Sequence, residues 1–324
     1  MNVGRFQVLA DNIDVTAAIA DRLISLRLSD EAGFEADLLE IELDDRGSIL
    51  ELPETGAVLD IALNKGGVLI AMGRFVVDQL SGRGAPDTLR ITATAADMSG
   101  TIRAPRTRAY EGQTIGSIAN HLASRNGLTA TVSPQIGAQS IGYVAQTAES
   151  DLHFVTRMVR QYGGTAKIAG GRLIISTRGA AERTDGVALE PAKLRRNQLS
   201  DFNWHIDKRE EVGRATADWH DQAGGARQTV SAGAGEPVVE LRHVYATQVE
   251  ASRAAQAQVD AGSRQLASFS AGIAGFRPDL FAEAPIEVSD VRDGIDGRWI
   301  LTRVEHVLRK ELKTRIDAER ALTP

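Results

Sequence analysis

Short segments that alternate apolar and polar residues occupy the first hundred positions of the chain. In residues 22–28, Ile24, Leu26 and Leu28 share one face, and polar residues take the other. Further strand-like segments follow at 39–43, 58–63, 73–80 and 88–94. Successive side chains of a strand point to opposite faces, so these segments are predicted strands with one buried face. Their number and spacing indicate an antiparallel sandwich or barrel.

The apolar spacing changes to that of a helix in the middle of the chain. One helix is predicted over 115–126, where Asn126 and the following glycine form a C-terminal stop. A second is predicted over 150–163, because Ser150 is a good N-cap. A predicted strand at 172–176 follows at once. Residues 109–180 are therefore expected to form a small α+β module between two β-rich regions.

Strand-like alternation returns from Asp201 and is interrupted by one long predicted helix over 247–266. Thr247 and Glu250 fit a capping box at its start. The run that follows is rich in alanine and glutamine, which favours a helix with a narrow face that packs closely on a sheet. The last predicted strands lie at 286–288 and 299–308, and the second has apolar residues on both faces, so both are expected to be buried in part.

Composition places the chain among ordinary folded proteins. Of its 324 residues, 43% are hydrophobic and 25% are charged. The absence of cysteine excludes disulfides, thiolate metal sites and cysteine nucleophiles. The chain has no run of about 18 apolar residues, so no membrane-spanning helix is predicted. The first residues show no basic stretch followed by an apolar one, so a secretory signal is not expected.

The net charge of −6 argues against a dedicated nucleic-acid-binding protein. Its distribution is uneven, because residues 1–60 hold fourteen acidic and four basic residues, a local charge of −10. A solvated acidic face and a surface that meets a basic partner or repels polyanions both explain this surplus. The two interpretations stay open at this point.

Catalytic and ligand-binding motifs are missing from the sequence. It contains no phosphate-binding loop, no dinucleotide-binding glycine pattern, no zinc-protease motif and no nucleophile elbow. The six histidines are scattered, at positions 121, 153, 205, 220, 243 and 306. His220-Asp221 is the one local acid–base pair, but adjacent residues of a strand point to opposite faces. We therefore predict no catalytic, cofactor-binding or metal-binding residues and no cofactor.

An ordered set of blocks runs through most of the chain, at 14–16, 21–26, 30–37, 43–45, 73–78, 125–128, 149–154 and 294–306. Together these blocks resemble the phage late control gene D protein family. The block Glu149-Ser150-Asp151-Leu152-His153-Phe154 also resembles the Glu-Ser-Asp-Phe segment of VgrG spikes. Residues 294–306 resemble the closing hairpin of the family.

The resemblance implies a mainly β fold with an α+β insert. Residues 1–108 are expected to form a first antiparallel β-barrel like those of tail tubes, and 109–180 the inserted module. Residues 181–324 are expected to form a second such barrel that includes the long helix over 247–266. Whether the first residues of this segment belong to the first barrel instead stays open. The start of the module, 112–118, is similar to LysM modules.

The function implied by the resemblance is that of a structural baseplate hub in a contractile tail. In that family the chains form a homotrimeric ring that adapts the sixfold tail tube to a trimeric membrane-piercing spike. The implied partners are the tube, the spike, other baseplate proteins and the tape measure protein, with no membrane anchor and with DNA only passing through the channel. The expected place is the virion tail, after assembly in the bacterial host cytoplasm. On this account part of the acidic surplus in residues 1–60 lines the channel.

Two other functions remain as alternatives. Residues 109–180 could bind peptidoglycan in the manner of a LysM module, with the flanking regions displaying them. Less favoured is a cell-wall hydrolase that uses His220. The acidic balance gives no support to a transcriptional role.

Overall fold

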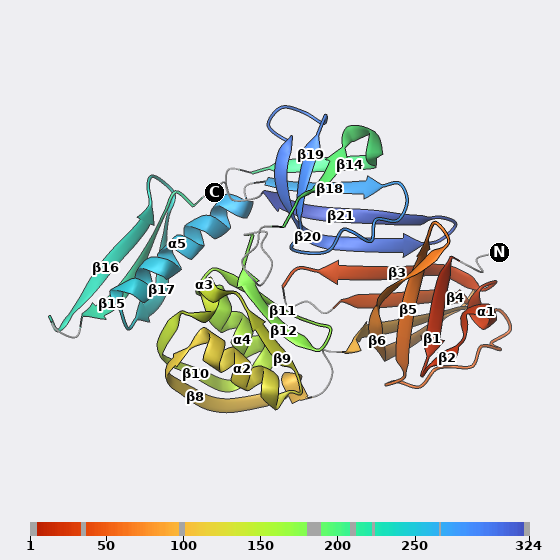
Figure 1. Cartoon of the computed structure of the whole chain (residues 1–324), viewed down its shortest axis with the longest axis horizontal. Coiled ribbons are helices and arrows are strands. Elements are labelled where there is room, and N and C mark those ends of the chain that lie inside the picture. The colour runs from red at the N-terminus through yellow and green to blue at the C-terminus, as the bar shows by residue number, and fades with distance from the viewer. Residues whose placement is uncertain are drawn as a thin grey trace.

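A sheet of thirteen strands joins the N-terminal and C-terminal regions of the chain (Figure 1). The computed structural model describes residues 5–33, 37–96, 101–179, 189–207, 212–221, 224–265 and 267–320. Three smaller sheets, of two, three and three strands, complete the β structure. No helix among these residues has the length and apolar character needed to cross a membrane.

The first half of the main sheet contains the N-terminal strands in the order β3-β4-β7-β6-β5-β1-β2. Their bounds are β1 (Phe6–Ala10), β2 (Ile13–Asp14), β3 (Leu23–Glu31), β4 (Leu38–Asp44), β5 (Val58–Lys65), β6 (Val68–Arg83) and β7 (Thr88–Ala95), with the short helix α1 (Thr16–Ile19) after β2. The sheet bends around one apolar core, in which Phe6, Leu26, Leu39 and Leu63 are fully buried. All five strands predicted in this region are confirmed.

One buried position in this half was predicted wrongly. Leu26 and Leu28 face the core, but Ile24 is 40% exposed. The reason is a β-bulge, because the register of β3 on β4 shifts between Leu23 and Ser25. A bulge inserts one extra residue and reverses the alternation beyond it. Leu23 therefore packs against the core where Ile24 was expected.

The second half of the main sheet contains the C-terminal strands in the order β14-β18-β21-β20, with β19 beside β20 and β13 beside β19. Their bounds are β13 (Ala192–Arg195), β14 (Leu199–Ile206), β18 (Ala267–Ile273), β19 (Pro285–Ser289), β20 (Gly297–Leu308) and β21 (Leu312–Arg320), and a 3-10 turn (Arg196–Gln198) precedes β14. Trp299 and Phe269 lie at the centre of its core. Both faces of β20 are buried over Trp299–Leu301, as predicted.

The two halves share one strand order. The path β3-β4-β7-β6-β5-β1 of the first half corresponds to β14-β18-β21-β20-β19-β13 of the second, and the strands appear in the same sequence order in each. The halves are joined because β20 of the second pairs antiparallel with β3 of the first. Within the described part of the chain neither path closes on itself, so the two closed barrels expected for a single chain are not seen. The expected mainly β fold with an α+β insert is confirmed.

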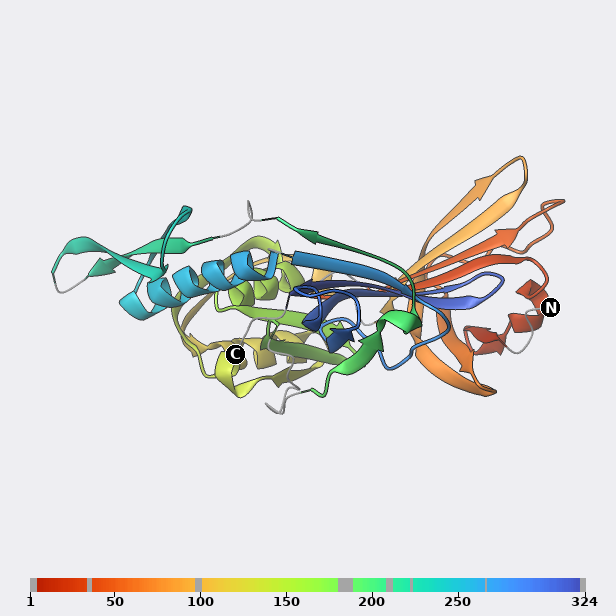
Figure 2. The same ribbon diagram turned by 90° about the horizontal axis from the view of Figure 1, so that it is seen from above.

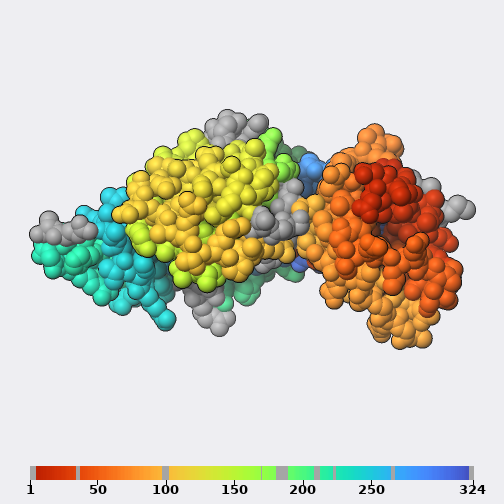
Figure 3. Space-filling model, turned by 90° about the horizontal axis from the view of Figure 1, so that it is seen from below, coloured from red at the N-terminus to blue at the C-terminus, as the bar shows by residue number. Residues whose placement is uncertain are grey.

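The middle of the chain forms a separate α+β layer, which we call the insert. It contains β8 (Pro105–Thr114), α2 (Ile115–Arg125), β9 (Thr129–Val132), α3 (Pro134–Gly137), β10 (Ser140–Ser150), α4 (Asp151–Arg160), β11 (Gly164–Ala169) and β12 (Arg172–Thr177), after a 3-10 turn (Thr101–Arg103). Both predicted helices and the predicted strand are confirmed. Ile118, Leu122, Phe154 and Val159 fill its own core. In the space-filling view from below, the insert and the first half stand out as two separate rounded masses (Figure 3).

A second projection, which we call the arm, consists of β15 (Arg214–Asp221), β16 (Ala226–Gly233), β17 (Val238–Tyr245) and α5 (Gln248–Gln265). It lies at the opposite end of the molecule from the first half (Figures 1 and 2). The predicted small-residue face of α5 is confirmed, since Ala251 and Ala255 pack against Ala215 and Ala217. The helix packs mainly on β15 and β16 of the three-stranded arm sheet, and it also contacts β21 of the main sheet.

Candidate functional site: a polar sheet face between two unpaired edges

Eight strands of the main sheet lie in one row, β14-β18-β21-β20-β3-β4-β7-β6, and each is antiparallel to its neighbours. The row ends on one side at residues 201–206 of β14 and on the other at residues 78–83 of β6. Strand β5 accompanies β6 only as far as Val76. In the part of the chain that the structure describes, no strand pairs with either end, so both present free backbone groups.

The apolar layer of the core reaches both edges and stops there. On β14, Trp204 is 38% exposed and Ile206 50% exposed. Their cross-strand partners, Phe269 and Ala267, are buried. On β6, the half-buried Leu80 lies opposite the buried Ile91. Each edge therefore carries apolar side chains that a neighbouring strand would cover.

The other face of the row is polar and is organised by ion pairs. Arg27 of β3 lies between Glu40 of β4, at 3.8 Å, and Glu305 of β20, at 3.5 Å. Across the same junction the Arg303 guanidinium lies 2.9 Å from the Glu31 carboxylate. Two of these contacts join β3 to β20 and so link the two halves of the chain. Partly buried pairs of this kind each contribute a modest amount of stability to the pairing of the two strands.

The acidic residues of β4 belong to this polar face. Glu40 lies within 3.8 Å of Arg27, and Glu42 within 3.5 Å of Arg90 on β7. At the β14 edge, Asp201 lies 3.3 Å from Arg315 of β21. Two acids of the N-terminal surplus, Glu40 and Glu42, are thus each paired with an arginine of a neighbouring strand.

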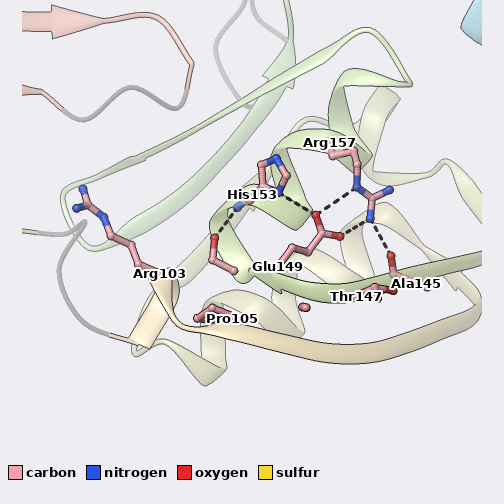
Figure 4. Close-up of a pocket in the computed structure, with 9 residues that line it drawn as sticks. Arg103, Pro105, Ala145, Thr147, Glu149, His153 and Arg157 are labelled. Atoms are coloured by element: carbon pink, nitrogen blue, oxygen red, sulfur yellow. Dashed lines mark hydrogen bonds and ion pairs between the residues drawn. The ribbon is translucent and has the colours of Figure 1, made fainter.

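A second group of polar residues forms the turn between β10 and α4, at the block that resembles the Glu-Ser-Asp segment (Figure 4). Ser150 caps the helix, because its hydroxyl accepts from the backbone N–H of His153 at 3.1 Å. Glu149 receives the Arg157 guanidinium and, at 3.0 Å, Nδ1 of His153. The pKa of Glu149 is lowered overall. Burial by itself would raise it, but the hydrogen bond and the charge of Arg157 have the larger, opposite effect. The preceding Ala148 has φ 47°, at a bulge in β10.

Asp151 is the buried centre of this turn. It is 1% exposed and accepts hydrogen bonds from Asn126 and from Gln146, each at 2.8 Å. The Arg125 guanidinium binds it in addition. A carboxylate surrounded by donors is held in place, and it ties α2, β10 and α4 together. The chemistry of the block is therefore that of a structural node, in which Ser150 is engaged as a cap.

A third polar group joins the insert to the main sheet. Lys167 of β11 binds the carboxylates of Asp30 and Asp37, the latter at 3.0 Å. Nearby, the Thr165 hydroxyl donates to Glu283 at 3.3 Å. Burial raises the pKa of Asp37 and that of Glu283, whereas the two carboxylates raise the pKa of Lys167 against the effect of its burial.

The structure brings two of the six histidines together, because His220 and His243 line one pocket with Tyr245 and Glu250. His220 and Asp221 are neighbours on β15 of the arm, opposite Arg227 and Ala226 of β16. His306 is buried in β20, with Nδ1 3.1 Å from the Thr314 hydroxyl, and burial lowers its pKa to about 4. Among the described residues no three histidine or acidic side chains are placed to hold a metal ion.

Sequence reasoning missed the last strand of the site, β21. Its signal is present, because Lys313, Arg315 and Asp317 alternate with the buried Thr314 and Ile316. The unpaired edges have a weaker signal. Trp204 and Ile206 are apolar residues on one face of a strand, and only the pairing of β14 tells that this strand has one neighbour.

Comparison with known proteins agrees with this architecture. The family model described as "Phage tail baseplate hub (GPD)" matches residues 34–312. A probable baseplate hub protein of Escherichia phage P2 is 32% identical over 345 residues, covering 94% of this chain and 89% of the phage protein.

Solved structures with the same fold come from phage tails and from a secretion system. The 43 kDa tail protein of prophage MuSo2 from Shewanella oneidensis has a TM-score of 0.73 at 14% identity and covers 98% of each chain. An E. coli component of the type VI secretion system, described as similar to the phage T4 tail proteins gp27 and gp5, has a TM-score of 0.57 at 13% identity, over 92% of this chain and 73% of that one. With the family model and the phage P2 relative both spanning most of its length, the chain belongs to the phage tail baseplate hub family.

Proposed function

We propose that copies of this hub protein join edge to edge into a homotrimeric ring, which adapts a sixfold tail tube to a trimeric membrane-piercing spike. The observation that carries the proposal is the pair of unpaired edges at the ends of the eight-strand row. Such an edge offers N–H and C=O groups to a strand of another chain. Two different edges on one molecule suit a head-to-tail contact that closes when the rotation between copies permits it.

Strand direction supports closure. Neighbours in the row are antiparallel throughout, and the row has an even number of strands, so β14 and β6 run in opposite directions. When β6 of one copy meets β14 of the next, the antiparallel alternation continues without a break. The contact between β20 and β3 is an example of the same kind of junction inside one chain.

The matching strand order of the two halves supports the change of symmetry. Each chain contributes two four-strand units of one topology, β14-β18-β21-β20 and β3-β4-β7-β6. Three chains supply six such units, which a sixfold tube can meet on one side of the ring. The ring as a whole keeps threefold symmetry, which suits a trimeric spike on the other side. The proposal keeps the division of the chain at 1–108, 109–180 and 181–324.

We place the polar face of the row toward the channel, because the opposite face of the row packs against the cores of both halves. The acids of β4, which belong to the N-terminal surplus, then line the channel beside their arginine partners. A surface of paired charges holds few free cations for a phosphate backbone to bind. DNA can pass along such a surface without lasting attachment.

The partners that follow are the tail tube, the spike, other baseplate proteins and, in the channel, the tape measure protein. Their contact with this chain would place it in the tail baseplate of the particle, after assembly in the cytoplasm of the bacterial host. The family supports this, because its relatives are hub and tail proteins. We propose no enzymatic activity, no cofactor and no membrane anchor for the chain.

The mass of the purified protein in solution, by light scattering, tests the ring. We expect wild type alone to have three times the mass of the 34.7 kDa chain, or to form a complex that contains three copies once its tube or spike partner is added. Ile206→Lys places a charge on the β14 edge and is expected to give a folded monomer, because an inward-pointing charge blocks strand addition. Ile13→Lys is the matched control, since Ile13 is 69% exposed and lies in β2, which is not one of the eight strands of the row. A persistent wild-type monomer contradicts the proposal.

A second candidate function is binding of peptidoglycan by the insert, which includes the segment similar to LysM modules. The insert has a core of its own, which suits a separate binding role. Retention of the full chain on insoluble cell walls would support it, and complete recovery in the unbound fraction would exclude it. A band in zymography that His220→Ala abolishes would support a hydrolase instead.

A further inference from the structure

The likeness of the two halves extends to their β-bulges. On β3 the register shifts between Leu23 and Ser25, and on the corresponding β14 it shifts between Leu199 and Asp201. On β20 it shifts between Leu301 and Arg303, and on the corresponding β6 between Val77 and Gln79. A bulge marks one position in a strand, so these shifts align the strands residue by residue. Ile24 corresponds to Ser200, and Thr302 corresponds to Asp78.

Because β6 corresponds to β20 and β14 to β3, the register in which β20 pairs with β3 inside the chain predicts a register for β6 on β14 of the next copy. Inside the chain, Arg303 pairs with Glu31 and Leu308 with Leu26. We propose that β6 of one copy pairs with β14 of the next in this same register, an inference that rests on the proposed ring. The pairs are then Gln79 with Asp207, Leu80 with Ile206, Ser81 with His205, Gly82 with Trp204, and Arg83 with Asn203.

The side chains fit these pairs on the apolar side of the sheet. Leu80 and Ile206, both partly exposed in the single chain, cover each other. Gly82 has no side chain, so the indole of Trp204 can lie across it. A slip by one residue would place each apolar side chain opposite a polar one of the other face.

The polar side of the sheet is also compatible. Gln79 faces Asp207 where Arg303 faces Glu31 in the internal junction, so an amide donor replaces a guanidinium. Arg83 comes opposite Asn203 and within diagonal reach of Asp201. A slip by two residues keeps the faces correct and would pair Arg83 with Asp201 directly. That offset register is the competitor which an experiment must separate.

Disulfide cross-linking separates the two registers, because the natural chain has no cysteine. The proposed register predicts a bond in Ser81→Cys/His205→Cys, and the offset register predicts one in Ser81→Cys/Asn203→Cys. All three positions are exposed, so both double variants are expected to fold. Residues directly opposite each other meet the distance requirement of a disulfide, and those displaced by two do not without movement, so we expect about tenfold more cross-linked product from the first variant.

The outcomes distinguish this inference from the ring itself. Cross-linked oligomers from the first variant, with little from the second and none from the single-cysteine variants, support the register. Efficient cross-linking of the second variant alone overturns the register but leaves a ring. No cross-link in either variant, with an oligomeric mass before oxidation, also overturns it. A monomeric mass throughout contradicts the ring.

Discussion

At the residue scale, the most constrained polar group of the insert is the carboxylate of Asp151. It is buried among Arg125 and Asn126, at the C-terminal end of α2, and Gln146 of β10. Removal of one member of a buried ion pair leaves the other charge without compensation. The block that resembles the Glu-Ser-Asp segment therefore has a physical role, which is to hold the insert together.

We predict that Asp151→Ala destabilises the chain by about 3–5 kcal/mol, because the half-buried guanidinium of Arg125 and the buried amide of Gln146 both lose this partner. Glu111→Ala is the matched control, since Glu111 is an exposed carboxylate in β8 of the same insert, and its effect is expected to stay within about 0.5 kcal/mol. Urea unfolding of both variants measures the difference. Equal effects would show that Asp151 is not a structural node.

At the element scale, β20 is the strand that joins the two halves, because it pairs with β19, β21 and β3. His306 lies on this strand between the Thr314 hydroxyl, at 3.1 Å, and the ring of Phe276, at 5.0 Å between centroids. It is 4% exposed. A buried neutral histidine makes this strand sensitive to acid.

We predict that acid weakens the chain through His306. Burial lowers the pKa of His306 from 6.5 to about 4, so the unfolded chain binds a proton at a higher pH than the folded chain does. The stability that the neutral, buried His306 allows is therefore fully present above about pH 6.5 and is lost as the pH falls toward 4. Between pH 7.5 and 4.5 this loss amounts to about 2–3 kcal/mol. His306→Gln does not titrate and lacks this loss.

The measurement is the free energy of unfolding of wild type and His306→Gln at both pH values. The free energy of unfolding of wild type minus that of His306→Gln is expected to fall by about 2–3 kcal/mol between pH 7.5 and 4.5. This change does not depend on how much the substitution itself costs at pH 7.5. An unchanged difference would mean that His306 becomes protonated without a penalty and is not enclosed as described.

Elements were predictable from sequence where the pattern is local. Strands β3 to β7 of the first half and helices α2, α4 and α5 follow from period and caps, such as the Thr247 hydroxyl that accepts from the N–H of Glu250 at 3.2 Å. Ile24 was not predictable, because a bulge changes the face of a residue without changing the sequence pattern. The sheet on which α5 packs was not predictable either, since a run of alanines does not specify its partner.

At the scale of the whole molecule, the features that carry the function are non-local. The family resemblance indicated a hub, and the comparisons show that the chain belongs to the hub family. The common strand order of the two halves and the two free edges become visible only when strands far apart in sequence are paired, such as β3 with β20. The absence of a catalytic residue set was a prediction from missing motifs, and zymography remains its test.

The most direct test of the central claim is a reconstruction of the tip of intact tail particles that contain this chain. The account predicts three copies in a ring between the end of the tube and the spike, with β6 of each copy continuing into β14 of the next. A ring held by other surfaces, with both edges free, would contradict the edge-to-edge contact. Finding the chain elsewhere on the particle would contradict the hub function as a whole.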